Sequence, residues 1–199
     1  MNPGGSGTTR PVRQEDMPFS IELRLDRESE NRIRAIWSEA AEFYGTNHVL
    51  ENGVIPHVAL LVGDSRLQAV FERLDVPVVR LALPGIGFFG GGDIAYLRAE
   101  IPPEVVTFQQ RAYDQAVQLG AQIETYYRPD QWVPHCTIAQ NCRTHREEPL
   151  KAGSIDAGIE SLILVRHPPT TLIAEQPRKR PNHNKVEPTR AQSGARGSP

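Results

Sequence analysis

Two short stretches of the chain, VIPHVAL and WVPHCTI, share one pattern: an apolar residue, proline, histidine, any residue, a small residue and an apolar residue. Side chains two apart on a strand point to the same face, so His57 shares a face with Ala59, and His135 with Thr137. Two imidazoles across one cleft can cleave a phosphodiester, because one accepts a proton from the nucleophile while the other protonates the leaving oxygen. The Thr137 hydroxyl can donate to a phosphate oxygen.

The periodicity around these stretches predicts the elements that must position the histidines. Alternating apolar residues predict strands, and apolar residues at helical spacing predict two long amphipathic helices, the first stopping at Gly45 and the second at Gly120. The predicted strands cover residues 19–25, 57–63, 132–140, 158–167 and 170–176, with two more joined by a glycine-rich connection within 78–101, and the predicted helices cover 27–44, 65–75 and 102–120. Each histidine strand thus follows a long helix, which indicates a repeated unit.

Composition indicates a water-soluble body with two polar ends. The 199 residues are 39% hydrophobic, which is enough to bury a core, and neither a membrane-spanning run nor the apolar core of a signal peptide is present, so we expect a cytoplasmic protein. We predict a disordered N-terminus at residues 1–16 and a disordered basic tail at 177–199, flanking one domain at 17–176. The formal charge of −2 hides an acidic body, which argues against a broad nucleic-acid-binding face.

The segments HVAL and HCTI resemble the paired His-x-Thr/Ser-x signatures of the 2H phosphoesterase superfamily, and the chain resembles its 2′-5′ RNA ligase and cyclic phosphodiesterase branch from about residue 19 to 176. The resemblance implies an α+β fold with two pseudo-symmetric lobes of antiparallel sheet and flanking helices around a central cleft. It also implies that His57 and His135 are catalytic and that Thr137 binds phosphate. The pattern is broken at Ala59, where the family has Thr or Ser, so one phosphate donor is missing.

The resulting functional hypothesis is a metal-independent phosphodiesterase acting on 2′,3′-cyclic phosphate ends of RNA, on 2′-5′ linkages or on small cyclic nucleotides. Tyr127 and Arg128 are candidate substrate-binding residues, because an aromatic ring can stack on a base and a guanidinium can attract a phosphate. We expect no cofactor, no metal and a monomer. Two alternatives stay open: a nucleotide- or RNA-end-binding module with little turnover, and a small-molecule esterase or lyase that uses the same cleft.

Other motifs receive weaker interpretations. Residues 85–90 match G-x-G-x-x-G, but a dinucleotide site needs a helix next, and the following residues alternate as a strand. Cys136 and Cys142 are too far apart in sequence for usual zinc-ligand spacing, and Cys136 should face away from its neighbouring histidine. The remaining histidines, which include His48 and His167, are predicted to be loop or surface residues.

Overall fold

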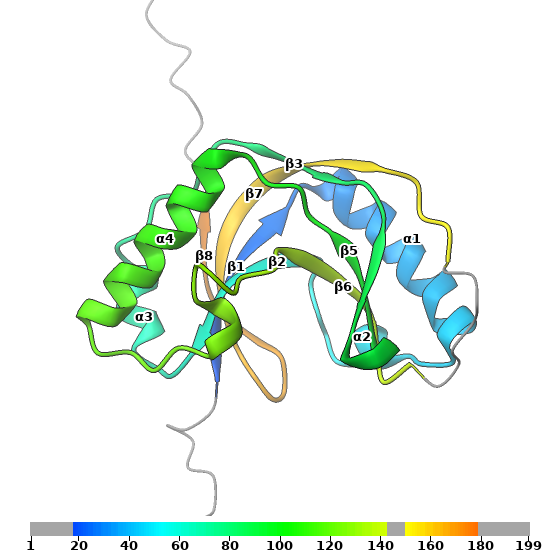
Figure 1. Ribbon diagram of the computed structural model, residues 1–199, viewed down its shortest axis with the longest axis horizontal. Coiled ribbons are helices and arrows are strands. Elements are labelled where there is room, and N and C mark those ends of the chain that lie inside the picture. The colour runs from blue at the N-terminus through cyan, green and yellow to red at the C-terminus, as the bar shows by residue number, and fades with distance from the viewer. Residues whose placement is uncertain (1–17, 143–149, 179–199) are drawn as a thin grey trace, which may run out of the picture.

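The computed structural model describes residues 18–142 and 150–178. The predicted disordered N-terminus, and the predicted tail beyond its first two residues, lie outside these described residues. Two antiparallel sheets form the molecule, with helices at both ends, as the α+β prediction requires (Figure 1).

The larger sheet has five strands. Its path runs β2, β1, β7 and β3, and β8 also pairs with β7, alongside a different part of that long strand from β3. The bounds are β1 Phe19–Leu25, β2 His57–Gly63, β3 Arg80–Leu83, β7 Ile155–Arg166 and β8 Thr171–Pro177. The first histidine therefore lies at the start of an outer strand, β2, beside β1.

The smaller sheet has three strands in the order β4, β5, β6, with bounds Ile86–Phe89, Ile94–Arg98 and His135–Gln140. Residues 78–101 thus form three strands, where the sequence analysis predicted two. Pro84 has no amide hydrogen to continue the ladder, so the chain leaves β3 there and enters β4 in the other sheet. The glycine-rich connection between β4 and β5 is a short 3₁₀ turn, η2 (Gly90–Gly92).

The two long helices form where the periodicity predicts them. In α1 (Arg27–Tyr44), the Asp26 side chain caps the first turn by accepting from the Ser29 amide at 2.9 Å, and Gly45 ends the helix in a left-handed conformation. Prolines at the start of α4 (Pro103–Gln118) suit a helix N-terminus, where the missing amide hydrogen has no partner to lose.

Each long helix covers the histidine strand that is more distant in sequence. The first helix, α1, packs on β6, whereas α4 packs on β2 and on the short helix α3 (Leu67–Phe71). Two further short elements, α2 (His48–Glu51) and η3 (Thr125–Tyr127), lie against β6 and β2 respectively. Each histidine strand is thereby packed against a helix from the other half of the chain.

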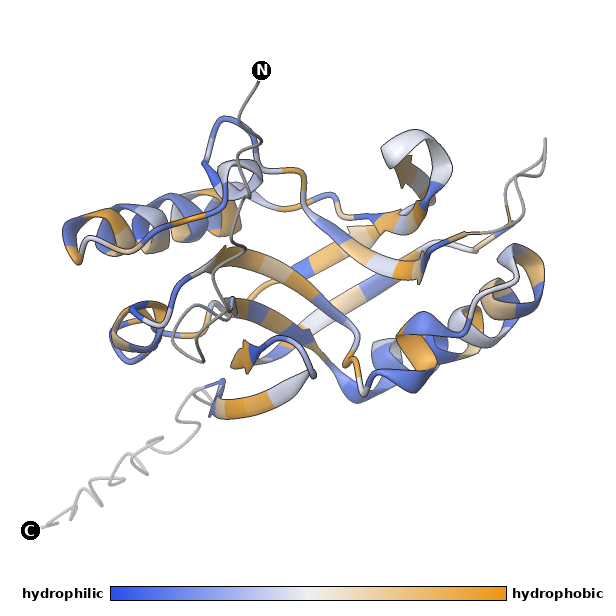
Figure 2. Cartoon of the chain, turned by 90° about the horizontal axis from the view of Figure 1, so that it is seen from below, coloured by the Kyte–Doolittle hydropathy of each residue, from blue (hydrophilic) through white to orange (hydrophobic). Residues whose placement is uncertain are grey.

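One hydrophobic core runs through both sheets, and the strands supply most of its buried residues (Figure 2). The apolar faces of α1 and α4 close this core on two sides, so the two sheets pack as parts of one body. Within the described residues, no helix is long and apolar enough to cross a membrane.

Candidate active site

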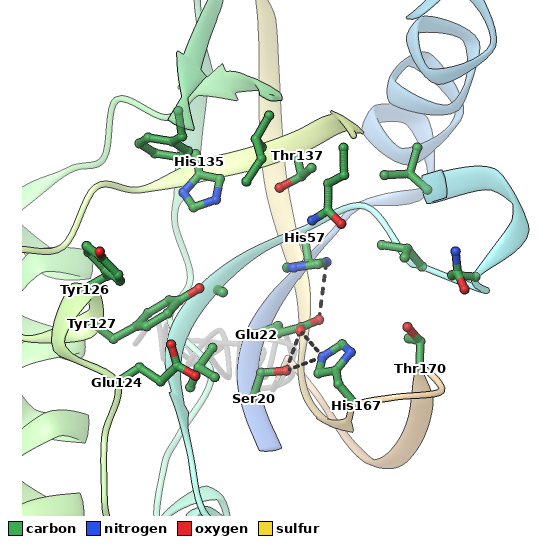
Figure 3. A pocket seen from close by; sticks show the side chains of 18 of the residues that line it. Ser20, Glu22, His57, Glu124, Tyr126, Tyr127, His135, Thr137, His167 and Thr170 are labelled. Carbon is green, nitrogen blue, oxygen red and sulfur yellow. Dashed lines mark hydrogen bonds and ion pairs between the residues drawn. The ribbon is translucent and has the colours of Figure 1, made fainter. Parts of the chain in front are cut away.

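A cavity of about 710 Å³ opens between the two sheets, and both histidine strands line it (Figure 3). His57 and Ala59 face it from β2, and His135 and Thr137 face it from β6. The alternate residues on the same strands (Val58, Leu60, Cys136 and Ile138) are buried in the core. The strand period therefore places both histidines of the repeated pattern at one cavity.

Both imidazoles are held by the same local device. The Nδ1 atom of His57 lies 2.6 Å from the carbonyl oxygen of Ile55, and that of His135 lies 2.7 Å from the carbonyl oxygen of Val133. A carbonyl can only accept, so each Nδ1 carries the hydrogen, which leaves Nε2 as the nitrogen free for chemistry. In each motif the accepting residue directly precedes a proline, which keeps that residue extended. This geometry explains why both motifs contain proline before histidine.

The chain has two tryptophans, and each binds the backbone of one motif. The indole Nε1 of Trp37, on α1, donates to the carbonyl of Thr137 at 3.0 Å, and that of Trp132 donates to the carbonyl of Ala59 at 3.0 Å. Both bonds therefore reach the residue two positions after a histidine. Like the long helices, each tryptophan therefore contacts the histidine strand that is more distant from it in sequence.

The electrostatic surroundings of the two histidines differ, and the difference comes mainly from Glu22. This buried residue of β1 places Oε2 3.3 Å from the Nδ1 of His57. Its Oε1 accepts a 2.5 Å hydrogen bond from the Ser20 hydroxyl and lies 3.6 Å from the Nε2 of His167, a residue that the turn between β7 and β8 brings to the cavity. Burial raises the pKa of Glu22, but the charge of His57 and the hydrogen bonds from His167 and Ser20 outweigh burial and lower this pKa overall.

His135 instead has aromatic neighbours. Its ring meets Phe89 edge-on at a centroid distance of 4.9 Å and Tyr96 at 5.2 Å, and those two rings stack on each other at 4.1 Å. Burial lowers the pKa of His135, as does its proximity to His57, and the hydrogen bond to the Val133 carbonyl only partly opposes this. Its ring therefore tends to stay neutral at a pH where an exposed histidine begins to gain a proton.

Of the two predicted substrate-binding residues, Tyr127 lines the cavity and Arg128 lies outside it. The Tyr127 ring points inward (Figure 3), and burial, together with the charges of Glu22 and Glu124, raises its pKa to about 12. Arg128 does not line the cavity; its side chain is 56% exposed and lies 4.0 Å from Asp130.

His167, His48 and Glu22 are among the cavity residues that escaped the sequence analysis. His167 and His48, predicted as loop or surface residues, both line the cavity, and His48 belongs to α2. Glu22 occupies the polar face of an alternating strand, which in a sequence is indistinguishable from a face open to solvent. Only the structure, in which Glu22 is 3% exposed, shows that this face is covered.

The cysteines do not contribute to the cavity. Cys136 is a free, buried thiol whose pKa is raised to about 12, chiefly by burial. In the part of the chain that the structure describes, no three His, Cys, Asp or Glu side chains are grouped so as to hold a metal ion.

Comparison with known proteins was made by sequence and by structure. No family model and no curated protein matches the sequence. Among solved structures, the chain is similar to E. coli LigT complexed with 3′-AMP, with a TM-score of 0.58 and 14% identity over 82% of this chain and 99% of LigT. It is also similar to the protein TT0787 of Thermus thermophilus, with a TM-score of 0.54 and 17% identity over 80% and 96% of the two chains.

A third similar structure is described as a phosphoesterase, with a TM-score of 0.56 and 14% identity over 82% of this chain and 99% of that one. At identities this low, the similarity is evidence about the fold alone. It extends over almost the whole length of the three similar proteins. The resemblance to the 2H phosphoesterases, first suggested by the two histidine motifs, is thus confirmed in the fold: this chain has the two-sheet architecture of LigT.

Proposed function

We propose that this protein is a metal-independent phosphodiesterase of the 2H type, acting on 2′,3′-cyclic phosphate ends of RNA or on 2′-5′-linked or cyclic nucleotides. The observation that carries the proposal is the matched pair of histidines. His57 and His135 line one cavity, and in each a backbone carbonyl holds Nδ1 so that Nε2 is left for proton transfer. Paired proton transfer of this kind contributes about 10²–10⁴-fold in rate for each group.

In the hydrolysis of a cyclic phosphate, the roles follow from the surroundings of the rings. The lowered pKa of His135 keeps it neutral near pH 7, so its Nε2 accepts a proton from the attacking water. The new P–O bond forms as the bond from phosphorus to one ribose oxygen breaks, and the Nε2–H of His57 protonates that oxygen. Ring opening yields a phosphomonoester and leaves His135 protonated and His57 neutral. In ligation, the 5′-hydroxyl of a second RNA end would attack in place of water, and the product would be a phosphodiester.

The remaining groups of the cavity suit a nucleotide. Thr137 donates its hydroxyl to a non-bridging phosphate oxygen, and Tyr127 with Trp132 offers aromatic surface against which a base can stack. The high pKa of Tyr127 keeps its hydroxyl protonated, so it is a hydrogen-bond donor over the whole working range of pH. The structures of LigT with 3′-AMP, ATP and NADP⁺ support this reading, because a nucleotide binds a protein of the same fold.

Ala59 favours one alternative, a module that binds nucleotides or RNA ends with little turnover. Its methyl group lines the cavity where the family has a hydroxyl, so the β2 side lacks that phosphate donor. A hydrogen bond to a charged group contributes about 1.5–3 kcal/mol. If it is made only in the transition state, its loss costs roughly ten- to a hundredfold in rate. Catalysis should therefore be weakened and still measurable.

The test uses a short RNA ending in a 2′,3′-cyclic phosphate and a 2′-5′-linked dinucleotide, both assayed with EDTA present. We expect product from the wild type, a loss of at least about a hundredfold in His57→Ala and in His135→Ala, and a gain in Ala59→Thr. If the wild type and Ala59→Thr both bind the RNA without forming product, the protein is a binding module and the proposed phosphodiesterase activity is refuted.

The substrate-binding residues are tested with a matched pair on adjacent positions. Tyr127→Ala should raise KM because it removes an inward-facing ring, whereas Arg128→Ala should leave it unchanged because that side chain lies outside the cavity. Equal KM values in the wild type and in Tyr127→Ala would remove Tyr127 from the substrate site.

A further inference from the structure

Glu22 is placed so that it acts on one histidine of the pair. In the antiparallel pairing of β1 with β2, it lies opposite Ala59, so its side chain shares the cavity face with that residue and with His57. Its two oxygens have different partners: Oε2 lies 3.3 Å from the Nδ1 of His57, and Oε1 accepts from Ser20. Figure 3 shows the carboxylate between the His57 and His167 rings.

The hydrogen bonds around Ser20 show how the carboxylate is held. The Ser20 hydroxyl has one hydrogen, which it donates to Glu22 at 2.5 Å. The Nε2 of His167, 3.1 Å from the same hydroxyl oxygen, must then donate to it. A chain of contacts thus runs from His167 through Ser20 to Glu22 and from there to His57. It links β1 and β2 to the turn after β7.

We infer that Glu22 is a positioning residue for His57, anchored by Ser20 and His167, and that it holds His57 as the proton donor of the pair. The assignment of a proton donor rests on the proposed function, whereas the coupling of Glu22 to His57 can be measured without turnover.

The physical reason is the asymmetry between the two Nδ1 atoms. The Nδ1 of His57 donates to the Ile55 carbonyl and also lies 3.3 Å from the Glu22 carboxylate. The Nδ1 of His135 donates to the Val133 carbonyl, and the neighbours of that ring are the aromatic side chains of Phe89 and Tyr96. A carboxylate within about 4–6 Å stabilises an imidazolium. Although burial raises the pKa of Glu22, the charge of His57, whose Nδ1 lies 3.3 Å from Oε2, helps to lower this pKa overall.

The other polar groups near His57 do not substitute for Glu22. A protonated His135 would repel a positive charge on His57, and the Cys136 thiol and the Tyr127 phenol are both neutral near pH 7. His167 contacts Glu22, so it acts on His57 only through that carboxylate. Arg24 is opposite His57 on β1, but its guanidinium is bound to Glu30 and Glu175. The other carboxylate of the cavity, Glu124, lies on the Tyr127 side (Figure 3).

The inference predicts a specific change in the pH profile. Activity should fall at low pH as His135 gains a proton and fall at high pH as His57 loses one. Glu22→Gln removes the negative charge in a side chain of nearly the same shape, so the high-pH limb should move about one pH unit lower while the low-pH limb stays. The value of kcat at pH 8 should drop by up to about tenfold with little change in KM. Glu22→Asp retains the charge and should restore part of the shift.

The deciding measurement is an NMR titration of the histidine ring protons in the free protein, because it needs no substrate. In Glu22→Gln, the His57 resonance should complete its change from the protonated to the neutral form about one pH unit lower than in the wild type, while His135 moves by less than about 0.3 unit. Glu124→Gln removes an equal charge from the far side of the same cavity and should leave the His57 titration unchanged.

Two failures can be told apart. A wild-type protein that makes no product refutes the proposed reaction, yet a shifted His57 titration in Glu22→Gln would still establish the coupling. An unshifted titration overturns the inference even in an active enzyme, as does an equal shift in Glu124→Gln. If Glu22→Gln does not fold, Glu22→Asp decides, because withdrawing the carboxylate by one methylene must move the His57 titration in the same direction by a smaller amount.

Discussion

Removing the indole hydrogen bond of Trp37 tests whether tertiary contacts from α1 hold the second histidine strand. Trp37 is 1% exposed, and its Nε1 donates to the Thr137 carbonyl at 3.0 Å. Trp37→Phe leaves that carbonyl without its partner, which costs about 1–3 kcal/mol. It also removes three ring atoms from a closed core, at about 0.8 kcal/mol for each carbon-sized group. The free energy of unfolding should therefore fall by about 3–5 kcal/mol.

Trp132→Phe is the matched control, since it deletes an equivalent bond to Ala59 at the same length but at a partly exposed site. Water can replace the lost donor there, so the expected cost is only about 1–2 kcal/mol. Urea unfolding followed by far-UV circular dichroism measures both variants without relying on tryptophan emission. A thermal scan should show the midpoint of Trp37→Phe lower by roughly 6–20 °C. A cost below about 1 kcal/mol for Trp37→Phe, or one no greater than for Trp132→Phe, would refute the reasoning.

Three further predictions concern the core, a helix cap and the aromatic support of the second histidine. Because burial raises the pKa of Cys136 to about 12, its thiol should resist iodoacetamide at pH 8 in the folded protein and react only on unfolding; rapid native alkylation would contradict its placement. Asp26→Ala should lower the free energy of unfolding by about 0.5–2 kcal/mol at pH 7, because it removes the cap of α1. Folding lowers the pKa of Asp26 below 3.8, so the difference in stability between wild type and variant, measured by urea unfolding, should be fully present above pH 3.8 and should disappear as the pH falls through this lowered pKa. Gly87→Ala should reduce kcat, because the new methyl group would lie 2.6 Å from the Tyr96 ring and displace it from His135. Gly85→Ala is the control, since its methyl group would have no atom within 4 Å. Equal kcat values in the two variants would show that the position of the Tyr96 ring does not matter for catalysis.

Local pattern predicted most of the elements and both faces of the histidine strands. The period of two in HVAL and HCTI is a property of extended backbone, so it already places each histidine opposite the core residues. The cap at Asp26 and the stop at Gly45 are equally local, because they depend on side-chain hydrogen bonding and on the left-handed conformation that glycine tolerates. These features need no knowledge of distant parts of the chain.

The features of the site that the sequence analysis could not place depended on where distant strands meet. Arg128 follows the aromatic pair in sequence, but its side chain points to solvent while the Tyr127 ring points into the cavity. His167 is far from His57 in sequence and has no motif of its own, so only the pairing of the end of β7 with the start of β1 reveals its place.

The sequence alone determined that two histidines stand on similar strands, each behind a proline, because strand period and proline geometry act within a few residues. The tertiary structure decided which groups make those histidines unequal. The burial of Glu22 beside His57 arises from the packing of β1 and β2, and the aromatic rings around His135 are brought there by β4, β5 and β6. Such contacts cannot be read from sequence, because desolvation and Coulomb interactions depend on distance in space.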